Sequence, residues 1–130
     1  MRRNQMREQG FFIVFENLFS CNNDMDEQIE LYSENVEPVC DYAKVIFSAV
    51  NNNKAEYNEI INKYSKSWKL NRLPKVTVAI LYVALFEILN NENVPNNVAI
   101  NEAVELAKKY GTNDDASYIN GILGSVVREA

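Results

Sequence analysis

Histidine is absent from this 130-residue sequence, and cysteine occurs only twice, as Cys21 and Cys40. Without histidine, zinc sites and His-based catalysis are excluded. Two cysteines do not make a disulfide framework, and each lies among apolar neighbours, so we expect small buried thiols. Glycine and proline are scarce, with 4 and 3 copies, and strand-like alternation of apolar and polar residues is missing. These absences favour an all-α fold.

Long apolar segments are missing as well. The longest run, residues 76–86, contains Thr77 and is too short to span a bilayer. Residues 1–10 are charged and lack an apolar core, so they do not form a secretion signal. We therefore expect a cytoplasmic protein. With 47% hydrophobic and 24% charged residues, the chain has the composition of one globular domain with its own core.

The sequence holds no constellation of catalytic residues. We find no glycine-rich phosphate loop, no nucleophile–base pair and no set of metal ligands. Glu87 is a carboxylate among apolar neighbours, and we interpret it as a structural group that a buried partner satisfies. We expect no catalytic residue, no metal and no cofactor, and hence a protein that is not an enzyme.

Positive charge is scarce overall, because the net charge is −5, but it is unevenly distributed. Arg2, Arg3 and Arg7 lie together at the start of the chain. A second basic segment contains no acid and consists of Lys63, Lys66, Lys69, Arg72 and Lys75. A negatively charged protein can bind RNA through a local basic surface. Charge alone favours the simpler interpretation, in which both segments are solvated helix faces. Trp68 is interpreted as an apolar pin between the two halves of the chain.

Apolar residues recur at helical spacing in seven segments. These predict helices over residues 3–20, 26–34, 38–50, 57–64, 75–90, 97–110 and 116–128. The segment 75–90 is apolar nearly all round, which places it at the centre of the domain. Three consecutive asparagines, residues 51–53, are predicted to separate the third helix from the fourth.

The sequence also predicts roles for single residues at the ends of the last two helices and within the last one. Gly111 is predicted to stop a helix in the left-handed conformation. Asp114 or Asp115 is predicted to cap the last helix. Gly121 is predicted to permit the close approach of a neighbouring helix.

Several blocks follow one another in the order of a known family. They are Arg3 and Arg7-Glu8 near the start, Trp68 with residues 72–76, residues 79–81 and 84–87, and then 94–95, 98–108, Gly111 and 119–123. In these blocks the sequence resembles the N-utilization substance B (NusB) transcription antitermination family over essentially its full length. The block 98–123 is the most specific, because many positions match in register.

The resemblance implies a compact, NusB-like bundle of about seven helices. It implies a single domain with two subdomains, at about residues 1–66 and 67–130. It also implies a non-enzymatic role. Members of the family pair with the ribosomal protein NusE and bind the boxA element of nascent RNA. Within the RNA polymerase antitermination complex they help the polymerase to pass terminators, notably on ribosomal RNA operons.

The resemblance also implies which residues act. The RNA-binding residues would be Arg2, Arg3, Arg7, Asp114, Ser117 and Tyr118, and the partner-binding residues would be Thr77, Val78 and Tyr82. Arginines supply planar, permanently charged donors for phosphates. Tyr118 has two open interpretations: a platform for an unpaired base, worth roughly 1–3 kcal/mol, or a core aromatic that holds the last helix. We expect the arginines and Tyr118 to share one groove.

Departures from the family pattern favour an alternative. Asn4, Val78, Tyr82 and Ser117 stand where the family often has basic residues. The alternative is a NusB-like protein-interaction module with weak or lost RNA binding. One form of it is a homodimer, in which a second copy covers an apolar face near Val78 and Tyr82.

Overall fold

The computed structural model describes residues 1–19, 24–66 and 68–129, so Cys21 lies outside the described part. Across these ranges the chain forms six α-helices, one short 3-10 helix and no strand, which confirms the all-α prediction. The elements are α1 (Arg3–Phe19), α2 (Met25–Asn35), α3 (Asp41–Tyr64), η1 (Leu70–Arg72), α4 (Lys75–Asn90), α5 (Asn96–Tyr110) and α6 (Asn113–Glu129). None of the helices described is long and apolar enough to cross a membrane.

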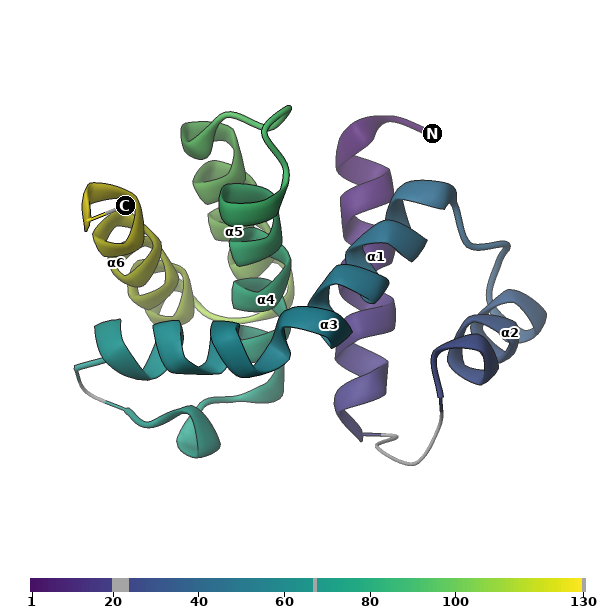
Figure 1. Cartoon of the computed structure of the whole chain (residues 1–130), viewed down its shortest axis with the longest axis horizontal. Coiled ribbons are helices and arrows are strands. Elements are labelled where there is room, and N and C mark those ends of the chain that lie inside the picture. Colours follow the sequence, from purple (N-terminus) through teal and green to yellow (C-terminus); the bar gives the residue numbers. More distant parts are fainter. Residues whose placement is uncertain (20–23, 67, 130) are drawn as a thin grey trace.

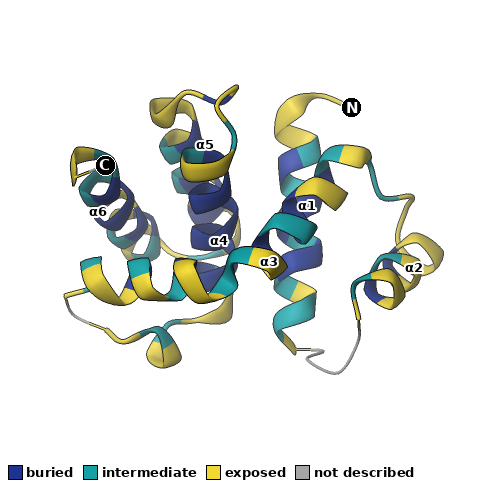
Figure 2. Cartoon of the chain, viewed as in Figure 1, coloured by how far each residue is buried: buried dark blue, intermediate teal, exposed yellow. Residues whose placement is uncertain are grey.

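α4 occupies the centre of the bundle, as predicted. Every residue from 77 through 87 is buried, and α1, α3, α5 and α6 all pack against this helix. Figure 1 shows α1 on one side of α4 and α6 on the other, with α2 at the periphery. Burial is concentrated on the central helices in Figure 2. One hydrophobic cluster includes residues from all six α-helices, so a single core holds the chain together.

α3 is one continuous helix, so the predicted break at residues 51–53 is wrong. Asparagine is a weak helix former, at a cost of a few tenths of a kcal/mol per residue. Both halves of α3 nevertheless bury apolar side chains, with Ile46 in the first half and Tyr57 and Ile61 in the second. The Asn53 side chain also donates to a backbone carbonyl one turn earlier at 2.8 Å. Tertiary packing therefore outweighs the local propensity, and two predicted helices become one.

The turn between α5 and α6 differs from the prediction. Gly111 has φ −123° and ψ −140°, so it is not left-handed. Its role is space, because a Cβ there would lie 2.8 Å from a carboxylate oxygen of Asp115 and 3.0 Å from the Ala107 carbonyl oxygen. The Asp115 N–H donates to the Thr112 hydroxyl at 3.1 Å, and the Thr112 N–H donates to the Asp115 carboxylate at 2.9 Å. This reciprocal pair is a capping box, in which Thr112 is the N-cap and Asp115, one of the two predicted capping residues, completes the cap.

Replacement by alanine is expected to change the stability of the fold in opposite directions at two helical glycines. At Gly10 a Cβ would lie 2.6 Å from Cδ1 of buried Ile46 and 3.2 Å from its Cβ, whereas at Gly121 no such atom lies within 4 Å. The close approach predicted at Gly121 is therefore wrong, and Gly10 provides one between α1 and α3. Gly10→Ala should lower the free energy of unfolding by about 1–3 kcal/mol. Gly121→Ala should raise it by about 0.5–1 kcal/mol. Urea unfolding measures both, and a shared sign would contradict the packing at Gly10.

Buried tyrosines should make the fold sensitive to alkali. Burial, assisted by nearby Glu56, raises the pKa of Tyr57 to about 12. Burial is also the main cause that raises the pKa values of Tyr32 and Tyr42 to about 12. An unfolded tyrosine ionises near pH 10, so this stabilisation is complete below pH 10 and is lost as the pH rises to about 12.

The alkaline loss has a direct test in one variant. At pH 11, Tyr57 should account for about 1 kcal/mol of the lost stability. Tyr57→Phe has no ionisable hydroxyl, so its stability should fall less than that of the wild type between pH 8 and pH 11 in urea unfolding. Equal losses in the two proteins would show that Tyr57 ionises normally in the folded state.

Candidate nucleic-acid interface

The start of α1 separates the predicted arginines. Arg2 and Arg3 are exposed at the tip of the helix. The guanidinium carbon of Arg3 lies 4.6 Å from the centroid of the Tyr42 ring, a cation–π arrangement. Arg7 is one turn further on and is only 3% exposed. The prediction that Arg7 contacts RNA is therefore contradicted, because its side chain lies inside the protein.

Arg7 is instead part of a buried polar cluster. Its Nε donates to Oε1 of Glu87 at 2.7 Å, and its Nη1 lies 3.8 Å from Oε2 of Glu102. The Tyr42 hydroxyl donates to the other carboxylate oxygen of Glu87 at 2.6 Å. The interpretation of Glu87 as a satisfied structural carboxylate is confirmed. The cluster joins α1, α3, α4 and α5 beneath the exposed arginines.

The predicted partner-binding residues are buried by the chain itself. Thr77, Val78 and Tyr82 are 1%, 7% and 3% exposed. α3 packs against α4, and the Tyr82 hydroxyl donates to the Asn58 side chain on α3. The predicted exposed partner surface at these residues is therefore wrong. The apolar face that motivated a homodimer is likewise part of the core, because α3 covers it.

The start of α6 presents the second predicted RNA cluster. Asp114 and Ser117 are exposed, and Tyr118 is half-buried. The Tyr118 hydroxyl is hydrogen-bonded to the Ser65 hydroxyl at the end of α3. The ring also lines a cavity of about 430 Å³. Tyr118 thus anchors α6 while part of its ring stays accessible, and this geometry leaves both of its interpretations open.

The two predicted RNA clusters do not share a groove, so that prediction is wrong. Arg3 stacks on Tyr42 near the start of α3, whereas Tyr118 is bonded to Ser65 just beyond its end. A helix of 24 residues is roughly 35 Å long at about 1.5 Å per residue. Figure 1 shows the consequence, with the amino terminus and α6 on opposite sides of α4.

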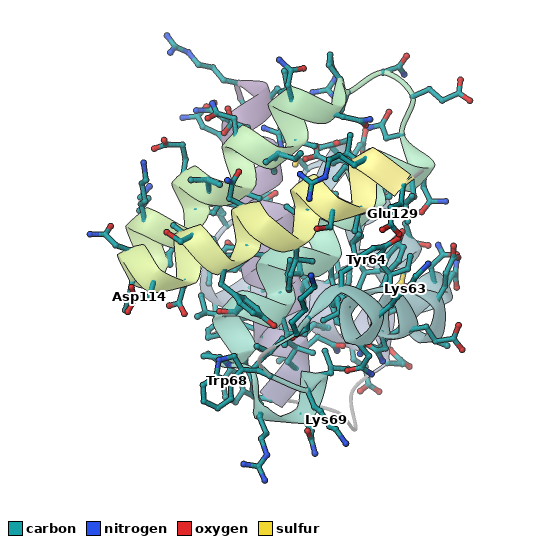
Figure 3. The ribbon with its side chains drawn as sticks, turned by 90° about the vertical axis from the view of Figure 1, so that its left-hand side faces the viewer. Lys63, Tyr64, Trp68, Lys69, Asp114 and Glu129 are labelled. Carbon is teal, nitrogen blue, oxygen red and sulfur yellow. The ribbon has the colours of Figure 1, made fainter. Side chains whose placement is uncertain are left out.

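A third exposed surface is a further candidate for RNA binding, although charge alone favoured a solvated helix face there. We call the segment of residues 65–75 that joins α3 to α4 the basic connection. Its cations, Lys66, Lys69, Arg72 and Lys75, are exposed, and none forms an ion pair with a described residue. Trp68 is 54% exposed, so its predicted role as an apolar pin is wrong. Figure 3 shows Trp68 and Lys69 at the edge of the molecule, below α6. The signal in the sequence was an acid-free basic run that contains a tryptophan.

Comparison with known proteins identifies similar sequences. The pattern of the NusB family matches residues 4–128. A protein of Lachnoclostridium phytofermentans is 40% identical over 98% of this chain and 99% of its own length. A protein of Clostridium botulinum (strain Alaska E43 / Type E3) is 35% identical over 99% of this chain and 100% of its own length. Both are named transcription antitermination protein NusB.

Solved structures show the same arrangement of helices. T. maritima NusB has a TM-score of 0.86 and 30% identity, and the match covers 99% of this chain and 92% of that one. A chain from the complex of antitermination factors NusB and NusE with dsRNA has a TM-score of 0.84. That match covers 100% of both chains, but at 21% identity it supports the fold alone.

Proposed function

Because this chain belongs to the NusB family, we propose that it is an RNA-binding transcription antitermination factor. In this role it pairs with the ribosomal protein NusE and binds boxA RNA in nascent ribosomal RNA transcripts, within the RNA polymerase antitermination complex. The observation that carries the proposal is the family match over residues 4–128, with relatives aligned along nearly their whole length. The role is non-enzymatic and cytoplasmic.

The proposed RNA contacts lie in two places. At one end of α3 they are Arg2 and Arg3, whose exposed guanidinium groups suit phosphates. At the other end they are Asp114, Ser117 and Tyr118 at the start of α6. Arg7 is left out, because its guanidinium pairs with a buried carboxylate. Thr77, Val78 and Tyr82 are not proposed as direct NusE contacts. Because they are buried, they can affect a partner only through the packing of α4 against its neighbours.

We also propose one domain with two subdomains, residues 1–66 and 67–130. The boundary falls in the basic connection, and the first part then contains α1 to α3 while the second contains α4 to α6. α4 packs against helices of both parts, so the two should unfold together.

Binding of labelled boxA RNA tests the proposed function directly. Fluorescence anisotropy at low salt should show saturable binding that purified NusE strengthens, and an RNA of the same composition in scrambled order should bind more weakly. Absence of binding in the mixture of all three components would overturn the proposal.

The alternative, a protein-interaction module with weak or lost RNA binding, has one observation in its favour. Only two of the three amino-terminal arginines are exposed, and Asn4 and Ser117 add no charge. This alternative requires that the complex with NusE forms normally while boxA RNA adds nothing to its stability. The same titration therefore separates the two functions.

A further inference from the structure

We propose that the basic connection is a binding site for single-stranded RNA, in which an unpaired base stacks on the Trp68 indole. The phosphates on either side of that base meet Lys66 and Lys69. This inference rests on the proposed RNA-binding function, and it adds a third contact surface to the two proposed above.

The exposed indole is held on a fixed backbone. The Ser65 hydroxyl is hydrogen-bonded both to the Trp68 carbonyl and to the Tyr118 hydroxyl of α6. Further along, the Leu70 N–H donates to the Asn62 side chain of α3 at 3.0 Å. The Trp68 carbonyl and the Leu70 N–H are therefore tied to packed helices, while 54% of Trp68 remains open to solvent. An aromatic face presented in this way can stack on any base.

Trp68 separates two cavities of the size that small ligands occupy. The larger, of about 680 Å³, is lined by Lys66 and Lys69 among others. The smaller, of about 430 Å³, is lined by Arg72, Tyr118 and Thr77. Trp68 belongs to both linings. A base stacked on the indole could therefore extend into one cavity while the adjoining backbone follows the lysines.

The smaller cavity has one polar group left without a partner. Thr77 is 1% exposed, and its hydroxyl has no hydrogen-bond partner within the described ranges. A buried hydroxyl without a partner is unfavourable. Thr77 lies in the cavity wall, but its hydroxyl oxygen is closed to solvent, so it offers no contact to a base in the cavity.

The charged residues around the two cavities determine how an RNA strand would be oriented there. Asp114 and Asp115 also line the smaller cavity, so a phosphate would be repelled there, whereas the amino group of a base would be accepted. The unpaired cations on the basic connection attract the phosphates instead. An acidic peptide would match Lys66 and Lys69 but not the indole or the two aspartates. The combination therefore favours single-stranded RNA over an acidic protein.

Trp68 is the only tryptophan of the chain, so its fluorescence reports on this site. Titration of the chain and NusE with single-stranded boxA RNA should quench this fluorescence in a saturable way. The Trp68→Phe protein lacks the tryptophan, so its titration measures the fluorescence of all other components. It should keep most of the affinity for RNA. Trp68→Ala should bind RNA about tenfold more weakly. Because the side chain is largely exposed, circular dichroism should show both variants folded.

Neutralising two lysines tests the phosphate contacts. The Lys66→Gln/Lys69→Gln variant should reduce the slope of log affinity against log salt by about 1.4, because each lysine that neutralises a phosphate of a single strand accounts for roughly 0.7 of that slope. Lys44→Gln/Lys54→Gln makes the same change of net charge on α3 and is the matched control. Its slope should equal that of the wild type.

The outcomes are distinct. If labelled RNA binds, but Trp68→Ala and Lys66→Gln/Lys69→Gln bind it like the wild type, this site is refuted and the proposed function stands. If no RNA binds in the presence of NusE, both are refuted. If a polyglutamate peptide quenches Trp68 and displaces RNA at equal concentration, the surface recognises acidic protein, and the inference is again overturned.

Discussion

Replacing Glu87 with alanine is expected to lower the free energy of unfolding by about 3–5 kcal/mol, because it leaves a buried charge without its partner. Arg7 and Glu87 are 3% and 1% exposed, and their closest atoms are 2.7 Å apart. The variant would also remove the acceptor of the Tyr42 hydroxyl. For a chain of this length the thermal midpoint should fall by roughly 10–20 °C, which calorimetry or circular dichroism can measure.

Two control variants isolate the buried charge as the cause. The double replacement Arg7→Met/Glu87→Leu removes both charges and should be close to neutral, or even stabilising. Lys109→Ala breaks an exposed ion pair with Glu8, whose atoms are 2.9 Å apart, and should change stability little. A Glu87→Ala protein within about 1 kcal/mol of the wild type would show that Arg7 reaches water when its partner is removed.

The buried cluster also positions the exposed cations. Tyr42 donates to Glu87 through its hydroxyl and carries the Arg3 guanidinium on its ring. The ion pair inside the protein and the cation at its surface therefore share one aromatic side chain. Loss of Glu87 should consequently affect the geometry of the amino terminus even under conditions in which the fold survives.

Structural features that depend on near neighbours in the sequence were predicted correctly. The apolar run of residues 76–86 predicted a central helix, and α4 is buried from Thr77 through Glu87. The same run predicted that Glu87 needs a buried partner. The identity of that partner was not predictable, because Arg7 is 80 positions away in the chain. A charged residue near the amino terminus is ordinarily exposed, so the same reasoning misplaced Arg7.

The errors at the site share one physical origin, which is packing between distant elements. The family resemblance implied that Thr77, Val78 and Tyr82 bind a partner, although these residues belong to the apolar run that predicted a central helix. All three residues are buried, and the Tyr82 hydroxyl donates to Asn58 of α3. Trp68 was assigned to the interior from its apolar character, yet the connection that carries it lies along the edge of the bundle.

Replacing both Arg2 and Arg3 with alanine is expected to weaken binding of boxA RNA about tenfold at about 0.15 M salt. Each arginine that meets a phosphate contributes roughly 0.7 to the slope of log affinity against log salt, so the double variant should lose about 1.4. Both side chains are exposed, and the core below them is unchanged, so the fold should persist. Anisotropy titrations between about 0.05 and 0.3 M KCl measure the slope, and an unchanged slope would remove these arginines from the interface.

A lysine pair at the same positions separates charge from geometry. Arg2→Lys/Arg3→Lys keeps both charges and should restore the slope, but the planar donors and the stacking of Arg3 on Tyr42 are lost, so affinity should recover only in part. The amino terminus and the basic connection lie near opposite ends of α3. Their contributions should therefore add in free energy for an RNA that reaches both. An RNA too short to span α3 should respond to changes at one end only, and a response to both would mean that the two surfaces are coupled through the protein.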